Sequence, residues 1–334
     1  MKPNRAFGLL FNLVAAGAFA QVNITGHESA DKAVTGLQIS VSTMDRTYVP
    51  LTVETKQTKV DASTTRSETA TRARLNDGSF FDFRNTTATT RQRDPNTTET
   101  VIETVENDRQ GGSRATRRIT AQTTKTATGE QSETSMYRRD SSGKLILDGQ
   151  IASTTTKNPD GSLNTVSVEK RADIDGAVRP QKQIEQTTTP LGENEKRVVS
   201  KIMTVDHLKG GFGLTSRETA TVHAEANTTR TEKLIQKPSG ASWQDIGRIV
   251  TTETRDADGS VRRETIEEGR SLYTKLTAPP MNVQPLVAQR KVVEREVRNP
   301  DGSIVMKRDV FRRDVNGEWK PVTFSTEAAA QAAY

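Results

Sequence analysis

The chain contains no cysteine, few aromatic residues and few histidines. Of its 334 residues, 32% are hydrophobic, 4% are aromatic and three are histidine. The absence of cysteine excludes disulfide bonds, thiol chemistry and cysteine-based zinc sites. The small share of apolar side chains leaves little material for a thick two-layer core. Beyond the first 20 residues, no apolar run approaches the roughly 20 residues that a membrane-spanning helix needs.

The N-terminus has the three parts of a secretory signal. Lys2 and Arg5 form a basic region, residues 6–17 are mostly apolar, and Ala18-Phe19-Ala20 fits a small-x-small cleavage site. We therefore predict that residues 1–20 are a signal peptide cleaved after Ala20, and that the mature chain is secreted or periplasmic, with cell-surface association as an option. An ordinary N-terminal helix is the alternative interpretation.

A short phrase recurs seven times along the chain: a basic residue, Asn or Asp, any residue, a turn-forming residue, Gly, any residue and usually an apolar one. The basic residue stands four positions before the Gly in six of the seven copies. The closest copies are residues 157–163, 255–261 and 298–304, and looser copies centre on Gly78, Gly143, Gly176 and Gly317. Such recurrence indicates an internal repeat rather than isolated surface loops.

The phrase has the chemistry of a hairpin turn. In Asn158-Pro159-Asp160-Gly161, Pro presets φ for the second position of a type I turn, Asn caps the turn, and Gly takes the left-handed conformation of a bulge. The predicted turn residues are Asp77, Gly78, Gly143, Asn158, Pro159, Asp160, Gly161, Gly176, Asp258, Gly259, Asn299, Pro300, Asp301, Gly302 and Gly317.

The segments between turns resemble strands. About one residue in seven is Thr, whose β-branched side chain favours strands. The turn spacing leaves room for about 16 strands of roughly 11 to 13 residues, long against the usual five or six. We therefore predict an all-β fold, a long antiparallel meander of hairpin repeats forming an elongated twisted or curled sheet. The same composition also fits disorder, most strongly for about residues 50–130.

The meander divides into several predicted segments. Residues 21–268 form the main hairpin-repeat region, and residues 291–326 contain further C-terminal hairpin repeats. Between them, residues 269–290 read as a linker or crossover, because Pro279, Pro280 and Pro285 cannot donate to a sheet ladder. Residues 327–334 form an Ala-rich tail too short for a stable helix of its own.

One turn resembles a known family. Tyr137-Arg138-Arg139-Asp140-Ser141-Ser142-Gly143-Lys144-Leu145 is similar to the hairpins of bacterial YD-repeat (Rhs-type) proteins, which carry Asp-x-x-Gly followed by a basic and an apolar residue. The resemblance implies a β-hairpin array with no catalytic residues to carry over.

Catalytic, cofactor and metal motifs are absent from the sequence. The histidines are His27, His207 and His223, and Asp206-His207 is not accompanied by a nucleophile elbow. Aligning Gly259 with the invariant Gly of a calcium loop places Thr254 and Thr265 at key ligand positions, where carboxylates are required. We therefore predict no enzymatic activity, no cofactor and no metal.

The charge pattern leaves three functional hypotheses. The net charge is +6 and the isoelectric point about 9.5, but basic residues are mixed with acidic ones, as in Arg262-Arg263-Glu264. The first hypothesis is a secreted non-enzymatic scaffold or surface protein that self-associates through sheet edges. The alternative is a binding module for a polyanion such as an acidic glycan, lipopolysaccharide or nucleic acid. An outer-membrane-type β-barrel is the second alternative, although strands such as 251–255 lack the alternating apolar residues that lipid requires.

Overall fold

The computed structural model describes residues 10–12, 20–27, 36–43, 51–74, 80–107, 112–140, 142–173, 175–206, 210–270, 285–301, 303–314 and 316–322. It divides into two compact units. The smaller unit comprises Met1–Tyr48 and Ser325–Tyr334. Its described residues form a three-stranded antiparallel sheet in the order β1 (Leu10–Asn12), β2 (Ala20–His27) and β3 (Gly36–Thr43).

The larger unit, Val49–Phe324, consists of strands and turns. Its described residues form seventeen strands: β4 (Leu51–Lys59), β5 (Thr64–Arg74), β6 (Phe80–Gln92), β7 (Thr97–Asn107), β8 (Ser113–Thr126), β9 (Gly129–Arg139), β10 (Leu145–Lys157), β11 (Leu163–Ala172), β12 (Val178–Pro190), β13 (Glu195–Asp206), β14 (Gly211–Glu225), β15 (Thr228–Ser239), β16 (Ser242–Arg255), β17 (Val261–Arg270), β18 (Leu286–Arg298), β19 (Ile304–Arg313) and β20 (Trp319–Pro321). Each strand pairs antiparallel with the one before it, so the predicted all-β hairpin meander is confirmed.

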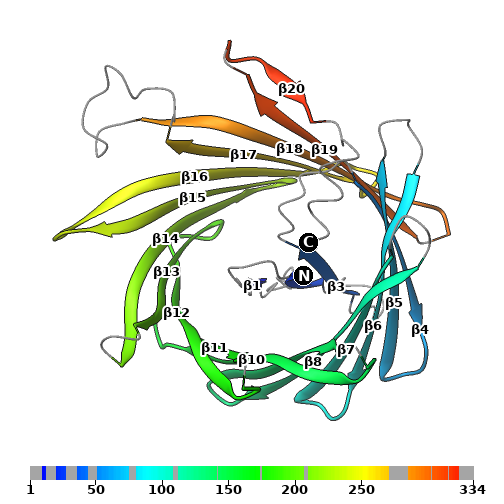
Figure 1. Ribbon diagram of the computed structural model, residues 1–334. Coiled ribbons are helices and arrows are strands. Elements are labelled where there is room, and N and C mark those ends of the chain that lie inside the picture. Colours follow the sequence, from blue (N-terminus) through cyan, green and yellow to red (C-terminus); the bar gives the residue numbers. More distant parts are fainter. Residues whose placement is uncertain are drawn as a thin grey trace, which may run out of the picture. The chain divides into compact units, whose positions relative to one another are not determined.

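The meander closes into a barrel (Figure 1). Residues 304–308 of β19 pair with residues 51–55 of β4, and this seam joins the two ends of a sixteen-stranded ring. The short strand β20 pairs with residues 311–313, farther along the same edge of β19. The sequence predicted an elongated twisted or curled sheet, with a closed barrel only as the second alternative. Closure has a physical reason: a twisted sheet of more than about ten strands curls, and joining its ends satisfies two otherwise exposed edges.

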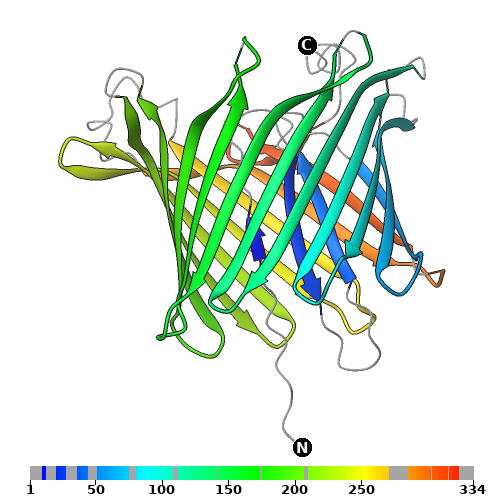
Figure 2. The same ribbon diagram turned by 90° about the horizontal axis from the view of Figure 1, so that it is seen from below.

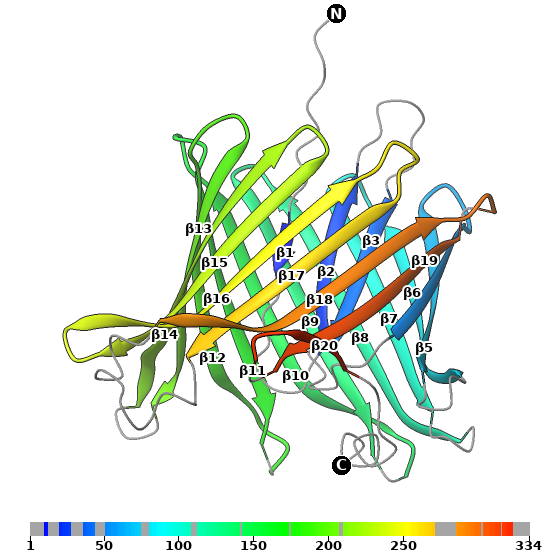
Figure 3. The same cartoon turned by 90° about the horizontal axis from the view of Figure 1, so that it is seen from above.

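The strands slant across the barrel wall, as Figures 2 and 3 show from opposite sides. The sixteen strands of the ring are long, from nine residues in β4 to fifteen in β14. Sixteen strands at about 4.8 Å spacing and a tilt near 40° give a backbone diameter of about 30 Å. A ring of this width is too large for small side chains alone to fill as a dry core.

Strand register divides the wall into two faces. In β10, Ile151, Ser153 and Thr155 are buried, while the alternating Ala152 and Thr154 are exposed. Following the cross-strand pairs around the ring places most buried residues on the same face as Ile151: Arg84, Thr86, Ala88, Thr100, Ile102, Glu169, Lys182, Ile202 and Val310. We identify this as the inner face, because side chains crowd together on the concave side of a curved sheet.

Hydroxyl groups join neighbouring strands on the inner face. Thr155 lies directly opposite Thr165, and their Oγ1 atoms are 2.9 Å apart. The same arrangement recurs between Thr55 and Thr69, Thr86 and Thr104, Thr90 and Thr100, Ser153 and Ser167, and Thr251 and Thr265. The abundant Thr therefore stabilises the wall in two ways: its β-branched side chain favours strands, and its hydroxyl groups hydrogen-bond across neighbouring strands.

The segments predicted around the repeats fall as follows. The proline-containing segment lies between β17 and β18, which are direct antiparallel neighbours, so it joins two adjacent strands. Residues 291–322 belong to the same unit as the strands that precede them. The tail at 327–334 lies outside the described residues. The expected cleavage point, Ala20, is the first residue of β2.

The hydroxyl pairs lead to a prediction. Replacing Thr155 or Thr165 singly with Val should lower the free energy of unfolding by about 1–2 kcal/mol, because the remaining hydroxyl loses its partner in a largely buried position. The double replacement should cost less than the sum of the two, because no unpaired hydroxyl remains. Urea unfolding of the four proteins measures the coupling, and strict additivity would contradict the pairing.

Candidate functional site

The predicted turns lie on both rims of the barrel. The three closest copies of the phrase connect β10 to β11, β16 to β17 and β18 to β19, all at one rim. The looser copies at Gly143, Gly176 and Gly317 connect strands at the opposite rim. Asp77, Gly78 and Gly302 lie outside the described residues. The turns at the first rim contain two to five residues between strands, whereas the β17–β18 connection at the opposite rim is much longer.

The turn residues make a repeated set of backbone hydrogen bonds. The Gly161 N–H donates to the Asn158 carbonyl at 3.0 Å, and the Asn158 N–H donates to the Ser162 carbonyl at 2.8 Å. Gly161 has a φ of +82°, a backbone conformation that residues with a Cβ atom rarely adopt. Gly143, Gly176, Gly259 and Gly317 have φ values from +79° to +84° in equivalent turns. Pro159 follows Asn158 at the second turn position.

Aspartates cap the turns of the first rim in a pattern that sequence reasoning missed. The Asp160 carboxylate accepts hydrogen bonds from the Ser162 backbone N–H at 2.9 Å and hydroxyl at 2.6 Å. Asp61, Asp94, Asp258 and Asp301 likewise accept from the backbone of the residue two positions on, which is Ser or Asn. The signal was present as Asp-x-Ser or Asp-x-Asn at five turns of this rim, and it recurs at Asp140 and Asp314 on the opposite rim. At the five turns of the first rim, these hydrogen bonds lower the pKa of the aspartate.

The turn conformation yields a second prediction. Replacing Gly161 with Val should lower the free energy of unfolding by about 1–3 kcal/mol, because a β-branched residue is strained at positive φ. Gly192 is a matched control, since it lies in another turn of the same rim, has no such φ and has open space around it. Thermal unfolding should show a clear loss for Gly161→Val and little change for Gly192→Val. Similar losses in both variants would show that left-handed geometry is not the cause.

A row of alternating charges crosses four strands on the inner face. Glu253, Arg263, Glu294 and Arg308 are direct cross-strand partners on β16, β17, β18 and β19. Arg263 donates to Glu253 at 2.6 Å and to Glu294 at 3.0 Å, and Arg308 donates to Glu294 at 2.7 Å. The row ends beside the seam, where Arg308 pairs with Leu51 of β4. It therefore connects the strands that bring the barrel to closure.

The two arginines set the charge state of Glu294. Burial acts to raise the pKa of Glu294, but Arg308 and Arg263 outweigh burial, and the net shift is downward. Burial acts to lower the pKa of Arg263, but Glu294 and Glu253 outweigh it, and the net shift is upward. Both partners are thus held in their charged forms.

The charged row provides a third prediction. Replacing Glu294 with Gln should lower the free energy of unfolding at pH 7 by about 2 kcal/mol, because two arginines lose a charged acceptor. The folded pKa of Glu294 is lowered, so its contribution is present above its unfolded pKa of about 4.3 and is lost as pH falls through the folded pKa. The difference between parent and variant should therefore shrink below about pH 4.

Glu264 supplies the matched control for that experiment. It lies on the outer face of β17, 3.8 Å from Arg262 and 3.2 Å from Lys291. Replacing Glu264 with Gln should cost less than about 1 kcal/mol, because its ion pairs are on the outer face and partly in contact with water. Equal losses in both variants across pH would contradict a special role for the inner row.

A second charged group lies on the inner face of β11 and β12. Lys182 lies opposite Glu169, which also accepts a hydrogen bond from Arg171 at 2.6 Å. Burial lowers the pKa of Lys182, against the opposing effects of Glu169 and Glu218. An amine with a lowered pKa can act as a nucleophile. However, in the described wall Lys182 is surrounded by charged side chains rather than by a cavity that could hold a substrate. We therefore interpret this group as charge pairing that stabilises the wall.

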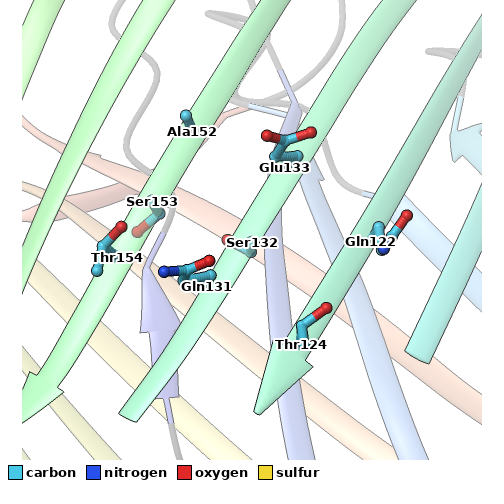
Figure 4. A pocket seen from close by; sticks show the side chains of 8 residues that line it. All are labelled: Gln122, Thr124, Gln131, Ser132, Glu133, Ala152, Ser153 and Thr154. Atoms are coloured by element: carbon cyan, nitrogen blue, oxygen red, sulfur yellow. The ribbon is translucent and has the colours of Figure 1, made fainter. Parts of the chain in front are cut away.

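The outer face carries a shallow polar depression of about 360 Å³ on β8, β9 and β10 (Figure 4). Its lining residues are Gln122, Thr124, Gln131, Ser132, Glu133, Ala152, Ser153 and Thr154, and the opposite wall lies behind them in this view. The depression offers amide and hydroxyl groups but a single carboxylate, whereas glycoside hydrolysis uses a pair.

The outer face is polar along most strands. On β8, the outward residues Arg118, Thr120, Gln122 and Thr124 include no apolar side chain. Arg248 of β16 donates to Glu268 at 2.7 Å and lies 3.3 Å from Glu232. Apolar outward residues such as Val250 are interspersed among charges rather than gathered into a continuous band.

Of the three histidines, only His223 has a side chain that the structure describes. His223 lies on β14, exposed, with its Nε2 atom 2.9 Å from Glu225. His27 is the last residue of β2, and His207 lies outside the described residues. Within the described ranges, no three His, Asp or Glu side chains are grouped closely enough to hold a metal. Thr254 and Thr265 lie in strands, opposite Arg262 and Thr251.

Comparisons with protein-family models, curated proteins and solved structures found no match to the chain. The resemblance of residues 137–145 to the YD-repeat family therefore stays a prediction. In the part of the chain that the structure describes, no helix has the length and hydropathy needed to cross a membrane.

Proposed function

We propose that this protein is an exported, non-enzymatic β-barrel that serves as a scaffold or surface component in an aqueous compartment. The observation that carries the proposal is the polarity of both faces of the wall. Threonine hydroxyls and ion pairs line the inner face, and charged, amide and hydroxyl groups cover much of the outer face. Such a wall is stable only with water on both sides, because isolated polar groups are costly to place against lipid.

An outer-membrane barrel is the second candidate function. In its favour are an even number of antiparallel strands, an expected export signal, and rims with short turns on one side and a long connection on the other. Against it, lipid-facing strands need an apolar outer band with aromatic girdles. The four outward polar residues of β8 lie where that band would be, so we favour the aqueous barrel.

Self-association, which the sequence analysis expected at open edges, has a restricted location in a closed ring. β19 and β4 share five residue pairs, against nine between β18 and β19. β4 continues to Lys59 beyond its last pair with β19, Thr55 with Ile304. An added strand from a second molecule would therefore have to bind along this seam.

Detergent dependence tests the proposal. The mature chain, residues 21–334, should fold in detergent-free buffer into a monodisperse, β-rich particle. Its circular dichroism and thermal unfolding midpoint should be unchanged when detergent micelles are added, because a polar outer face has no apolar band for detergent to cover. Aggregation without detergent, with recovery of the β-rich fold in micelles or vesicles, would favour the outer-membrane barrel. Sedimentation over a concentration series would reveal association through the seam.

A further inference from the structure

Three basic residues form an unbroken row on the outer face of β17, β18 and β19. Arg262 is the direct cross-strand partner of Arg295, which is the direct partner of Lys307. These strands run side by side along the wall in Figure 3. Neighbouring charges are separated by about one strand spacing, so the row places three positive charges within about 10 Å. A second row with basic residues on three adjacent strands, Arg290, Arg312 and Lys320, differs from this one, because Arg290 is ion-paired with Glu267 and Lys320 with Glu318.

The three residues are exposed and incompletely neutralised. Arg295 and Lys307 are exposed, and neither has an ion-pair partner within 4 Å among the described residues. Arg262 is 57% exposed at its side chain and lies 3.8 Å from Glu264, which is closer to Lys291 at 3.2 Å. Like charges placed directly opposite each other destabilise a sheet. The row therefore slightly lowers the stability of the fold.

The adjoining residues on the same strands are arranged in the opposite way. Arg263 and Glu294, one position from Arg262 and Arg295, belong to the inner row of alternating charges. The outer row thus places like charges opposite each other, whereas the inner row on the neighbouring residue pairs places opposite charges together. An anion that approaches from the solvent can compensate the charge of the outer row.

The surroundings of the row define the chemistry of the anion. The positions flanking the row include Val297, which is 50% exposed, and Val305, its partner across the strands. Glu264 and Asp309 lie on the opposite side of the row, and their negative charges repel anionic groups there. The flanking rows include no aromatic residue on which a base could stack, which single-stranded nucleic acid binding generally uses. Arginine and lysine bind sulfate, carboxylate and phosphate groups, and the two valines offer an apolar surface beside them.

We propose that Arg262, Arg295 and Lys307 form a binding site for an acidic polysaccharide on the outer wall of the barrel. The site extends across Thr52 toward Arg72, which follows in the same row but is already bound to Asp82 at 2.9 Å. The chain of the polysaccharide would cross the strands, with successive acidic groups meeting successive strands. This inference goes beyond the scaffold function, because a barrel without this site would still be a scaffold.

The test compares two triple variants with the same loss of charge. The site variant is Arg262→Ser, Arg295→Ser and Lys307→Ser. The control variant is Arg91→Ser, Lys201→Ser and Arg230→Ser, which removes outer-face charges from the separate strands β6, β13 and β15. Heparin is the probe, neutral dextran is the uncharged comparison, and a short DNA duplex is the nucleic-acid comparison. Affinity is measured by calorimetry or by surface binding at about 0.1 M salt, where charges are screened beyond about 10 Å.

The site variant should bind heparin about tenfold more weakly than the parent, and the control variant within about twofold of it. Binding by the parent should weaken as salt increases, and dextran should not bind. If both variants lost the same heparin affinity, the effect would be due to net charge alone, and the proposed site would be wrong. Absence of heparin binding by the parent, or tighter binding of the duplex through the same three residues, would overturn the polysaccharide assignment.

Thermal unfolding separates loss of binding from loss of the fold. The site variant should unfold at the same temperature as the parent or higher, because it removes like-charge repulsion. Heparin should raise the unfolding temperature of the parent and leave that of the site variant nearly unchanged. If the triple variant fails to fold, the single variant Arg295→Ser provides the same comparison, with a smaller expected loss of affinity.

Discussion

The structure depends on the cross-strand residue pair. A wall one sheet thick, with few aromatic side chains, has no deep core in which apolar residues from different layers could meet. Its strands must therefore be held to one another by what faces what across each pair, on both sides of the sheet. On the inner side these contacts are hydroxyl pairs such as Thr155 with Thr165 and the charged row through Arg263 and Glu294. Because the side-chain period of a strand is two, a shift of one residue in any pair would exchange the inner and outer sets for every following strand. Register is thus the property on which closure, stability and surface chemistry all rest.

The strands and turns could be predicted from the sequence because their causes are local. Asn158-Pro159-Asp160-Gly161 specifies a turn by its own side chains, and β-branched residues between turns favour strands. Closure could not be predicted, because it is decided at a seam whose partners, residues 51–55 and 304–308, are far apart in the sequence. The two faces were also hidden, since both are polar: residues 304–313 alternate without giving either face a uniform character. The pairing of Arg262, Arg263 and Glu264 shows the same limit, because neighbours of identical charge lie on opposite faces and only the register tells them apart.

The polarity of the wall constrains what the barrel can do. The charged partners of Glu294 and the hydrogen bonds at Asp160 both favour ionised carboxylates, so the fold is matched to neutral pH and is weakened by acid. The turns at one rim are short and repeatedly capped by aspartate, which leaves little chain there for a binding loop. Chemistry that needs a buried, dry pocket is poorly served by such a construction. The same construction suits binding on an extended outer surface, because the regular strand spacing fixes the distances between outward side chains on neighbouring strands.

The contrast between the two sides of β17, β18 and β19 is the strongest functional signal in the molecule. The inner row shows that alternating charges fit this backbone, with donor–acceptor distances of 2.6 to 3.0 Å. The outer row lies on the neighbouring residue pairs of the same strands and is more exposed to water, and its three central residues carry one sign. Solvent screening keeps the repulsion small at the surface, so the fold can retain the row without a large loss of stability. Stability alone therefore neither requires nor forbids it. What the row changes is the local potential outside the barrel, and that potential acts on a ligand approaching from solution rather than on the strands themselves.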